Sequence, residues 1–204
     1  MSERGRFIVV EGGEGCGKST QAKRLASTLG AVLTREPGGT DIGLALRALL
    51  LDPETRDLDD RAEMLLMAAD RAQHVATVIE PALAAGRDVV CDRFVGSSVA
   101  YQGYGRGIPT EDVLAASRIA TRGLEPDLVV LLVVSPEVSA LRLGAELDRF
   151  ESAGEGFHSR VLEGFGAQAE ADPSRWAVVD GVGSRDEVAR RIATVVAERL
   201  AVRG

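Results

Sequence analysis

Residues 12–20 read GGEGCGKST and directly follow the apolar run FIVV of residues 7–10. The spacing of Gly12, four residues, then Gly17, Lys18 and Ser19 is the pattern of a phosphate-binding loop. Glycines let the backbone turn so that its N–H groups meet phosphate oxygens, the lysine reaches the β and γ phosphates, and the serine hydroxyl can ligate Mg²⁺. The segment therefore predicts a nucleoside triphosphate site between a strand and a helix. The residues expected around the triphosphate are Gly12, Gly13, Glu14, Gly15, Cys16, Gly17, Lys18, Ser19 and Thr20.

Strand and helix patterns alternate along the rest of the chain, which predicts an α/β fold with a five-stranded parallel sheet flanked by helices. The strands are expected at residues 6–11, 31–34, 88–92, 128–134 and 176–179. The helices are expected at residues 18–29, 41–51, 59–85 with a kink at Pro81, 111–122 with Thr110 as N-cap, from Pro136 onward, 157–171, and after a capping box of Ser184 and Glu187. The 204 residues are expected to form one domain.

Composition excludes several classes of function. A formal charge of −7 argues against a broad basic surface for nucleic acid, so we expect no nucleic-acid partner. No apolar run is long enough to cross a membrane and no signal peptide is recognisable, which predicts a cytoplasmic protein without a membrane partner. Cys16 and Cys91 are expected to be reduced thiols, and the isolated His74 and His158 offer little for a metal cluster.

A phosphate-binding loop occurs in motors, switches and kinases, so other features must discriminate between them. Guanine-specific switches read their base through an Asn-Lys-x-Asp segment, and this chain contains no asparagine. The HRD and DFG segments of protein kinases are also absent. A small phosphotransferase or an ATP-driven module remains.

The strand at 88–92 ends in Asp92 followed by Arg93, at the edge of the sheet where open α/β folds bind ligands. Asp92 is expected near Mg²⁺, with water between them, and together with Ser19 forms the predicted metal site. Arg93 offers a fork suited to an acceptor phosphate. A structural ion pair at a strand end is the alternative reading.

Six ordered segments carry a resemblance that covers nearly the whole chain: TREPGGT (34–40), AADRAQ (68–73), VCDRFVGSSVAYQ (90–102), YQGYGRG (101–107), PDLVVLL (126–132) and ELDRFE (146–151). Together they resemble the thymidylate kinase family of bacterial type. The resemblance implies a P-loop NTPase-type three-layer fold with a short mobile lid at about residues 144–156. It also implies Mg²⁺-dependent transfer of the ATP γ-phosphoryl group to dTMP, and a homodimer.

The resemblance also implies roles in binding the acceptor nucleoside. Arg71 would donate hydrogen bonds to a thymine carbonyl, although an exposed, ion-paired arginine is the alternative. Ser98 and Gln102 would present polar atoms to the pyrimidine edge or sugar, and Tyr101 would pack beneath C2′ and exclude ribose. Met67 stands where relatives usually have an aromatic residue that stacks on thymine. Its thioether can lie on a ring, but Met67 as core filling is an equal alternative.

Around the phosphates, Glu14 would approach the 3′-hydroxyl of the acceptor or the waters on Mg²⁺, and Arg35 would help Arg93 to hold the acceptor phosphate. Arg149 in ELDRFE matches a lid arginine that stabilises the migrating phosphoryl group, with Arg142 as a second candidate. The residues expected to be catalytic are Lys18, Arg93, Arg149 and Asp92.

Three hypotheses follow. Thymidylate kinase is favoured; a nucleoside monophosphate kinase of broader pyrimidine preference is second; a non-enzymatic ATP-dependent switch is third. Phosphorylation of different monophosphates discriminates between them.

Overall fold

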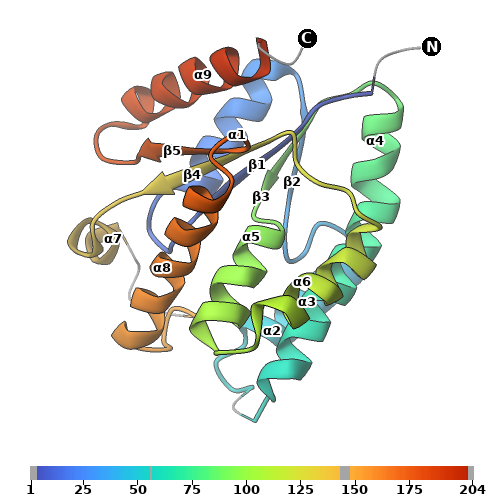
Figure 1. Cartoon of the computed structure of the whole chain (residues 1–204), viewed down its shortest axis with the longest axis vertical. Coiled ribbons are helices and arrows are strands. Elements are labelled where there is room, and N and C mark those ends of the chain that lie inside the picture. The colour runs from blue at the N-terminus through green and yellow to red at the C-terminus, as the bar shows by residue number, and fades with distance from the viewer. Residues whose placement is uncertain (1–3, 56, 143–147, 202–204) are drawn as a thin grey trace.

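The computed structural model describes residues 4–55, 57–142 and 148–201. Its sheet has five parallel strands in the order β2-β3-β1-β4-β5, and helices cover both of its faces (Figure 1). The strands are β1 (Phe7–Gly12), β2 (Val32–Arg35), β3 (Val89–Asp92), β4 (Leu128–Val133) and β5 (Trp176–Asp180). The helices are α1 (Lys18–Leu29), α2 (Asp41–Leu51), α3 (Asp60–His74), η1 (Val75–Ile79), α4 (Glu80–Ala84), α5 (Val95–Ser98), η2 (Val99–Gly105), α6 (Thr110–Thr121), α7 (Pro136–Arg142), α8 (Glu155–Ala171) and α9 (Arg185–Ala201). The predicted three-layer α/β fold is confirmed.

The central strand β1 is buried on both faces, because its side chains alternate between two apolar clusters. Ile8 and Val10 pack with residues of α1 and α9. Phe7 and Val9 pack on the other face with residues of η1 and α4. The sheet is therefore the middle layer and carries the core on either side.

The strand register brings two predicted motifs together. In the parallel pairing of β1 with β3, Val10 lies opposite Asp92. The phosphate-binding loop after β1 therefore starts beside the segment that begins with Arg93. Both lie at the carboxyl edge of the sheet, where open α/β folds bind ligands.

The helix predicted at 59–85 is present but changes its hydrogen bonding before Pro81. The segment η1 widens to π-type bonding, and the Glu80 N–H donates to the Val75 carbonyl five residues earlier. Pro81 has no N–H to continue the α-helical pattern, so a wider turn at this point has a local cause. The prediction of Thr110 as N-cap was wrong by one position. The Pro109 carbonyl accepts the first helical bonds, and the Thr110 side chain makes no capping bond.

The sequence reading placed no helix at 95–105, where α5 and η2 form a continuous helical segment. Val95, Gly96 and Ser97 are weak helix formers, so local propensity gave no signal. Burial accounts for the segment instead, because Val99, Ala100 and Tyr101 of η2 are all buried. The capping box of Ser184 and Glu187 at the start of α9 is confirmed, with the Glu187 carboxylate accepting from the Ser184 N–H at 2.8 Å.

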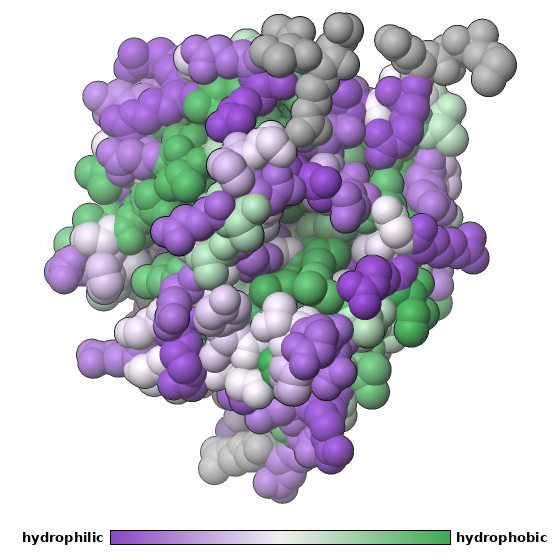
Figure 2. All heavy atoms as spheres, in the orientation of Figure 1, coloured by the Kyte–Doolittle hydropathy of each residue, from purple (hydrophilic) through white to green (hydrophobic). Residues whose placement is uncertain are grey.

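Hydrophilic side chains predominate on the face seen in Figure 2 and surround smaller apolar patches. Within the described residues, none of the helices has the length and apolarity required to cross a bilayer. Of the predicted lid, residues 144–147 lie outside the described residues. The remainder runs from Asp148 through a turn into α8.

Candidate active site

The loop after β1 binds the Lys18 side chain through one of the loop's backbone carbonyl groups. Gly15 and Gly17 have φ angles of 66° and 92°, which glycine adopts without steric cost. Lys18 opens α1 and is buried; its Nζ donates to the Gly13 carbonyl at 3.0 Å and lies 3.5 Å from Oε2 of Glu14. A cavity of about 670 Å³ opens over this loop and is lined by all residues from 14 to 21. We call it the P-loop cavity.

A second cavity of about 210 Å³ adjoins the first, because Glu14, Lys18 and Ser19 line both. It gathers residues that lie far apart in the sequence, and we call it the acceptor cavity. The residues that the sequence placed in the site and that line it are Glu14, Lys18, Ser19, Arg35, Met67, Arg71, Asp92, Arg93, Ser98, Tyr101 and Gln102. Every residue expected to bind the acceptor nucleotide is thus at one cavity.

Glu11 secures the segment that carries Arg93. It is fully buried, and its Oε1 accepts from the N–H groups of Phe94 and Ser97, each at 2.9 Å. Its Oε2 accepts from the Ser97 hydroxyl at 2.6 Å. Burial raises the pKa of Glu11. Arg93 itself has a φ of 71°, a conformation that non-glycine residues rarely adopt, so the anchored turn holds its backbone in place.

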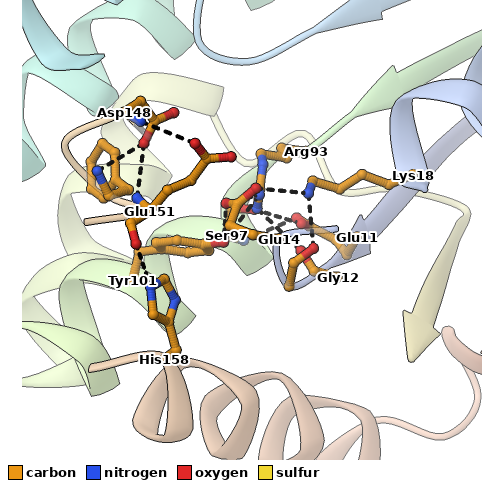
Figure 3. A network of polar contacts seen from close by, with 12 residues as sticks. Glu11, Gly12, Glu14, Lys18, Arg93, Ser97, Tyr101, Asp148, Glu151 and His158 are labelled. Carbon is orange, nitrogen blue, oxygen red and sulfur yellow. Dashed lines mark hydrogen bonds and ion pairs between the residues drawn. The ribbon is translucent and has the colours of Figure 1, made fainter. Parts of the chain in front are cut away.

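Arg93, Glu14 and Tyr101 all line the acceptor cavity and form a compact network of polar contacts (Figure 3). Nη2 of Arg93 donates to Oε1 of Glu14 at 2.5 Å and to the Tyr101 hydroxyl at 3.0 Å, and that hydroxyl donates to the same carboxylate oxygen at 2.5 Å. Burial alone would raise the pKa of Glu14, but the charges of Arg93 and Lys18 outweigh it and lower the pKa to about 2. Burial raises the pKa of Tyr101 well above its ordinary value, so the hydroxyl keeps its proton.

Arg71 is buried in the wall of the acceptor cavity, so the alternative of an exposed arginine does not hold. Its Nε donates to Glu36 at 2.8 Å, its Nη2 to the Phe94 carbonyl and the Ser98 hydroxyl at 3.0 Å each, and its Nη1 to Ser117 at 3.3 Å. A guanidinium has five N–H donors, so within the described part of the chain one N–H of Nη1 is left for a ligand. The side chain is therefore fixed and offers a single donor.

Two side-chain oxygen groups of the kind that ligate a cation line the acceptor cavity. Ser19 lines both cavities, and Asp92 lines the acceptor cavity with a buried Oδ1 that has no hydrogen-bond partner among the described residues. A hard cation such as Mg²⁺ binds to one or two such side chains and completes its shell with phosphates and water. The donor set therefore fits the magnesium predicted at these residues.

Three predicted residues line neither of these two cavities. The carbonyls of Gly12 and Gly13 accept hydrogen bonds from Arg93 and Lys18. Arg149 is held elsewhere: its Nε donates to the Leu50 carbonyl at 2.9 Å and its Nη2 to Glu63 at 2.5 Å. Arg142, the second lid candidate, does line the P-loop cavity.

The sequence reading missed Arg47 and Glu36, which also line the acceptor cavity. Arg47 donates to the Pro37 carbonyl at 3.0 Å, and burial next to the charge of Arg35 lowers its pKa. Arg47 is the one basic residue of the helix DIGLALRALLL. A single arginine in an otherwise apolar helix could have indicated a binding residue. Glu36 had no such signal, because its partner Arg71 is distant in the sequence.

Comparisons with known proteins agree with this geometry. The family model described as thymidylate kinase matches residues 10–192. A thymidylate kinase of Solidesulfovibrio magneticus is 48% identical over 95% of this chain and 100% of its own length. One from Synechococcus sp. (strain JA-3-3Ab) is 50% identical over 95% of this chain and 96% of its own. The crystal structure of thymidylate kinase from Ehrlichia chaffeensis has a TM-score of 0.79 at 30% identity, covering 95% of this chain and 98% of that one. The chain has the P-loop NTPase-type fold and belongs to the thymidylate kinase family.

Proposed function

We propose that this chain transfers the γ-phosphoryl group of ATP to dTMP, giving dTDP and ADP, as a step in dTTP biosynthesis. Its family makes it a phosphotransferase enzyme. The observation that carries the proposal is that Glu14, Lys18 and Ser19 line both cavities. A triphosphate on the P-loop and a monophosphate in the acceptor cavity would therefore meet end to end.

In this proposal Arg93 and Arg35 bind the acceptor phosphate, and Arg47 adds a third guanidinium on the same cavity. Arg71 reads a carbonyl of the base with its remaining N–H, and Ser98 and Gln102 face the pyrimidine edge or sugar. Tyr101 would lie beneath C2′ and disfavour ribose. Its ring is held in place by edge contacts with aromatic neighbours, such as Phe150 at a centroid distance of 5.7 Å.

The chemistry needs little acid or base catalysis. A monophosphate oxygen is already an anionic nucleophile, so the difficulty is to bring two polyanions together without water. Lys18 and Arg93 supply positive charge where the cavities join. Glu14 would approach the 3′-hydroxyl of the acceptor or the waters on the cation. Mg²⁺ held near Ser19 and Asp92 would neutralise phosphate charge, as cations do in this class of reaction.

The lid and Arg149 remain part of the proposal. For Arg149 to reach the migrating phosphoryl group, its contacts with Glu63 and the Leu50 carbonyl must be released. Closure of a lid over the site would supply the exclusion of water that transfer requires. We propose that residues 1–204 act as one kinase domain with this lid.

A kinase of broader pyrimidine preference is the second candidate, because Met67 lines the acceptor cavity where an aromatic ring would stack more strongly. A coupled assay of ADP release with dTMP, dUMP, UMP, CMP, AMP and GMP separates the candidates. Stimulation by dTMP above all others supports the first, stimulation mainly by another monophosphate the second, and none at all contradicts both. Lys18→Met should abolish transfer while circular dichroism shows an intact fold; a fully active variant would contradict the assignment.

We also propose that the chain acts in the cytoplasm as a homodimer. Large apolar side chains are exposed on the neighbouring helices α3 and α6, with Leu65 57% and Ile119 82% exposed, and burial in a symmetric interface would remove them from water. Light scattering should give twice the chain mass, and Ile119→Glu should shift it toward the monomer. A wild-type monomer at micromolar concentration would contradict the dimer.

A further inference from the structure

Glu63 of α3 is a fully buried carboxylate surrounded by donors. Its Oε2 accepts from Nη2 of Arg106 at 3.0 Å and from Nη2 of Arg149 at 2.5 Å. Its Oε1 accepts from Nε2 of Gln102 at 2.8 Å and, more weakly, from Nε of Arg106 at 3.4 Å. The two guanidinium charges are matched by Glu63 and by Asp60, which lies 3.4 Å from Arg106. The cluster therefore contains two positive and two negative side chains. In each of these hydrogen bonds Glu63 is the acceptor and its partner is the donor.

This arrangement determines which end of the Gln102 amide faces the acceptor cavity. Guanidinium groups have donors but no acceptor, so the Glu63 carboxylate is the acceptor in its contacts with Arg106 and Arg149. Gln102 must therefore turn its NH₂ group toward Glu63. No group in the described part of the chain donates to its carbonyl oxygen, and the residue lines the cavity, so Oε1 is the atom offered there. Gln102 thus presents an acceptor.

We propose that Glu63 is the positioning residue that sets the base preference of the acceptor cavity, by fixing Gln102 as a hydrogen-bond acceptor. The inference rests on the proposed function, because it specifies how that acceptor site selects its pyrimidine. Arg71 offers a donor and Gln102 an acceptor in the same cavity wall. Such a pair fits thymine and uracil. Their C4 carbonyl would accept from Arg71, and the neighbouring N3–H would donate to Gln102.

Cytosine has the opposite pattern, with an amino group at C4 and an unprotonated N3. It would place its amino hydrogens against the donor of Arg71 and its N3 lone pair against the acceptor of Gln102. Mismatches of this kind, which leave buried polar groups unpaired, are the strongest source of discrimination available to a binding site. The carbonyl oxygen of Gln102 therefore discriminates between the bases together with the N–H donor of Arg71.

Exchange of Glu63 for glutamine should reverse the amide of Gln102. Arg106 and Arg149 only donate, so the amide introduced by Glu63→Gln must turn its carbonyl toward them and its NH₂ toward Gln102. Gln102 would then rotate to accept from that NH₂, and its own NH₂ would face the cavity. The acceptor that suits thymine and uracil would become a donor that suits N3 of cytosine.

The test compares kcat/KM for dUMP and dCMP, which differ only at this edge of the ring. The wild type should favour dUMP by roughly 100-fold or more. In Glu63→Gln this ratio should fall by roughly tenfold or more, because dUMP is used less well and dCMP better. Glu63→Asp, which keeps an acceptor-only group, should retain most of the ratio. Asp60→Asn, which removes another contact of Arg106 but none of Gln102, is the matched control and should leave the ratio unchanged.

The outcomes are separable. Equal losses for dUMP and dCMP in Glu63→Gln would mean a merely structural role and overturn the inference, as would a wild type that does not distinguish the two. If Glu63→Gln does not fold, Gln102→Met and Glu63→Asp decide together: loss of the dUMP preference in Gln102→Met with a retained ratio in Glu63→Asp supports the inference, and an unchanged ratio in Gln102→Met overturns it. A wild type inactive toward dTMP, with any ratio, would instead overturn the proposed function.

Discussion

Replacement of Arg71 by lysine should weaken dTMP binding selectively. Lysine keeps the positive charge opposite Glu36 but offers three donors from one nitrogen, in place of the fork that contacts Glu36, Ser98, Ser117 and the Phe94 carbonyl. Loss of the charged donor that faces the ligand should cost about 1.5–3 kcal/mol of dTMP binding, roughly a tenfold to hundredfold rise in Kd. Loss of two of the hydrogen bonds that the guanidinium donates within the protein should lower the free energy of unfolding by about 3 kcal/mol or more, because bonds from a charged group contribute about 1.5–3 kcal/mol each.

Isothermal titration with dTMP and, separately, with a non-hydrolysable ATP analogue measures the effect. Affinity for the ATP analogue should be unchanged, because Arg71 lines the acceptor cavity and not the P-loop cavity. Arg61→Lys is the matched control on the same helix, since its exposed side chain pairs only with Asp59 among the described residues. Unchanged dTMP affinity, or equal weakening of both ligands, would refute the role of Arg71 in reading the base.

Three further predictions concern other positions. Met67→Phe should strengthen dTMP binding by about 0.5–1.5 kcal/mol through a ring contact with the base. Unchanged or weaker binding in a titration would contradict the placement of residue 67 against the base. Arg149→Ala should lower kcat more than it raises either KM, whereas wild-type turnover in steady-state kinetics would contradict its role at the phosphoryl group. The pKa of Glu14 is lowered from 4.5 to about 2, so its contribution to stability is complete above pH 4.5 and is lost as the pH falls toward 2. Urea unfolding of the wild type should therefore lose about 2 kcal/mol more between pH 6 and pH 3 than Glu14→Gln, and parallel curves would contradict the pairing with Arg93.

Features with local causes could be predicted from the sequence. The glycine and lysine spacing of the loop, the apolar runs of the strands and the capping box at Ser184 each depend on neighbours in the chain, and each is confirmed. The acceptor cavity also followed from motifs, because parallel strands bring Asp92 and the phosphate-binding loop to one edge. The helix from Val95 was missed because it is buried against α8, which is distant in the sequence, and its own residues are weak helix formers.

The partners of charged side chains could not be predicted. Glu36 and Glu63 look like ordinary surface acids in the sequence, yet both are buried against arginines 35 to 86 residues away. A buried carboxylate is stable only when such donors reach it, and the chain order gives no sign of which donors do. The same reason explains why the pairing of Arg149 with Glu63, which leaves Arg149 lining neither cavity, was not foreseen.

The salt bridge from Glu14 to Arg93 pairs a carboxylate of the phosphate-binding loop with the guanidinium that we propose for the acceptor phosphate. Under the proposed function, a monophosphate would displace that carboxylate from Arg93, so ligand entry would exchange one anion for another. A neutral nucleoside would not compete for the guanidinium, whereas a dianionic monophosphate would. The same ion pair would therefore favour phosphorylated ligands through charge, in addition to any contacts with the base.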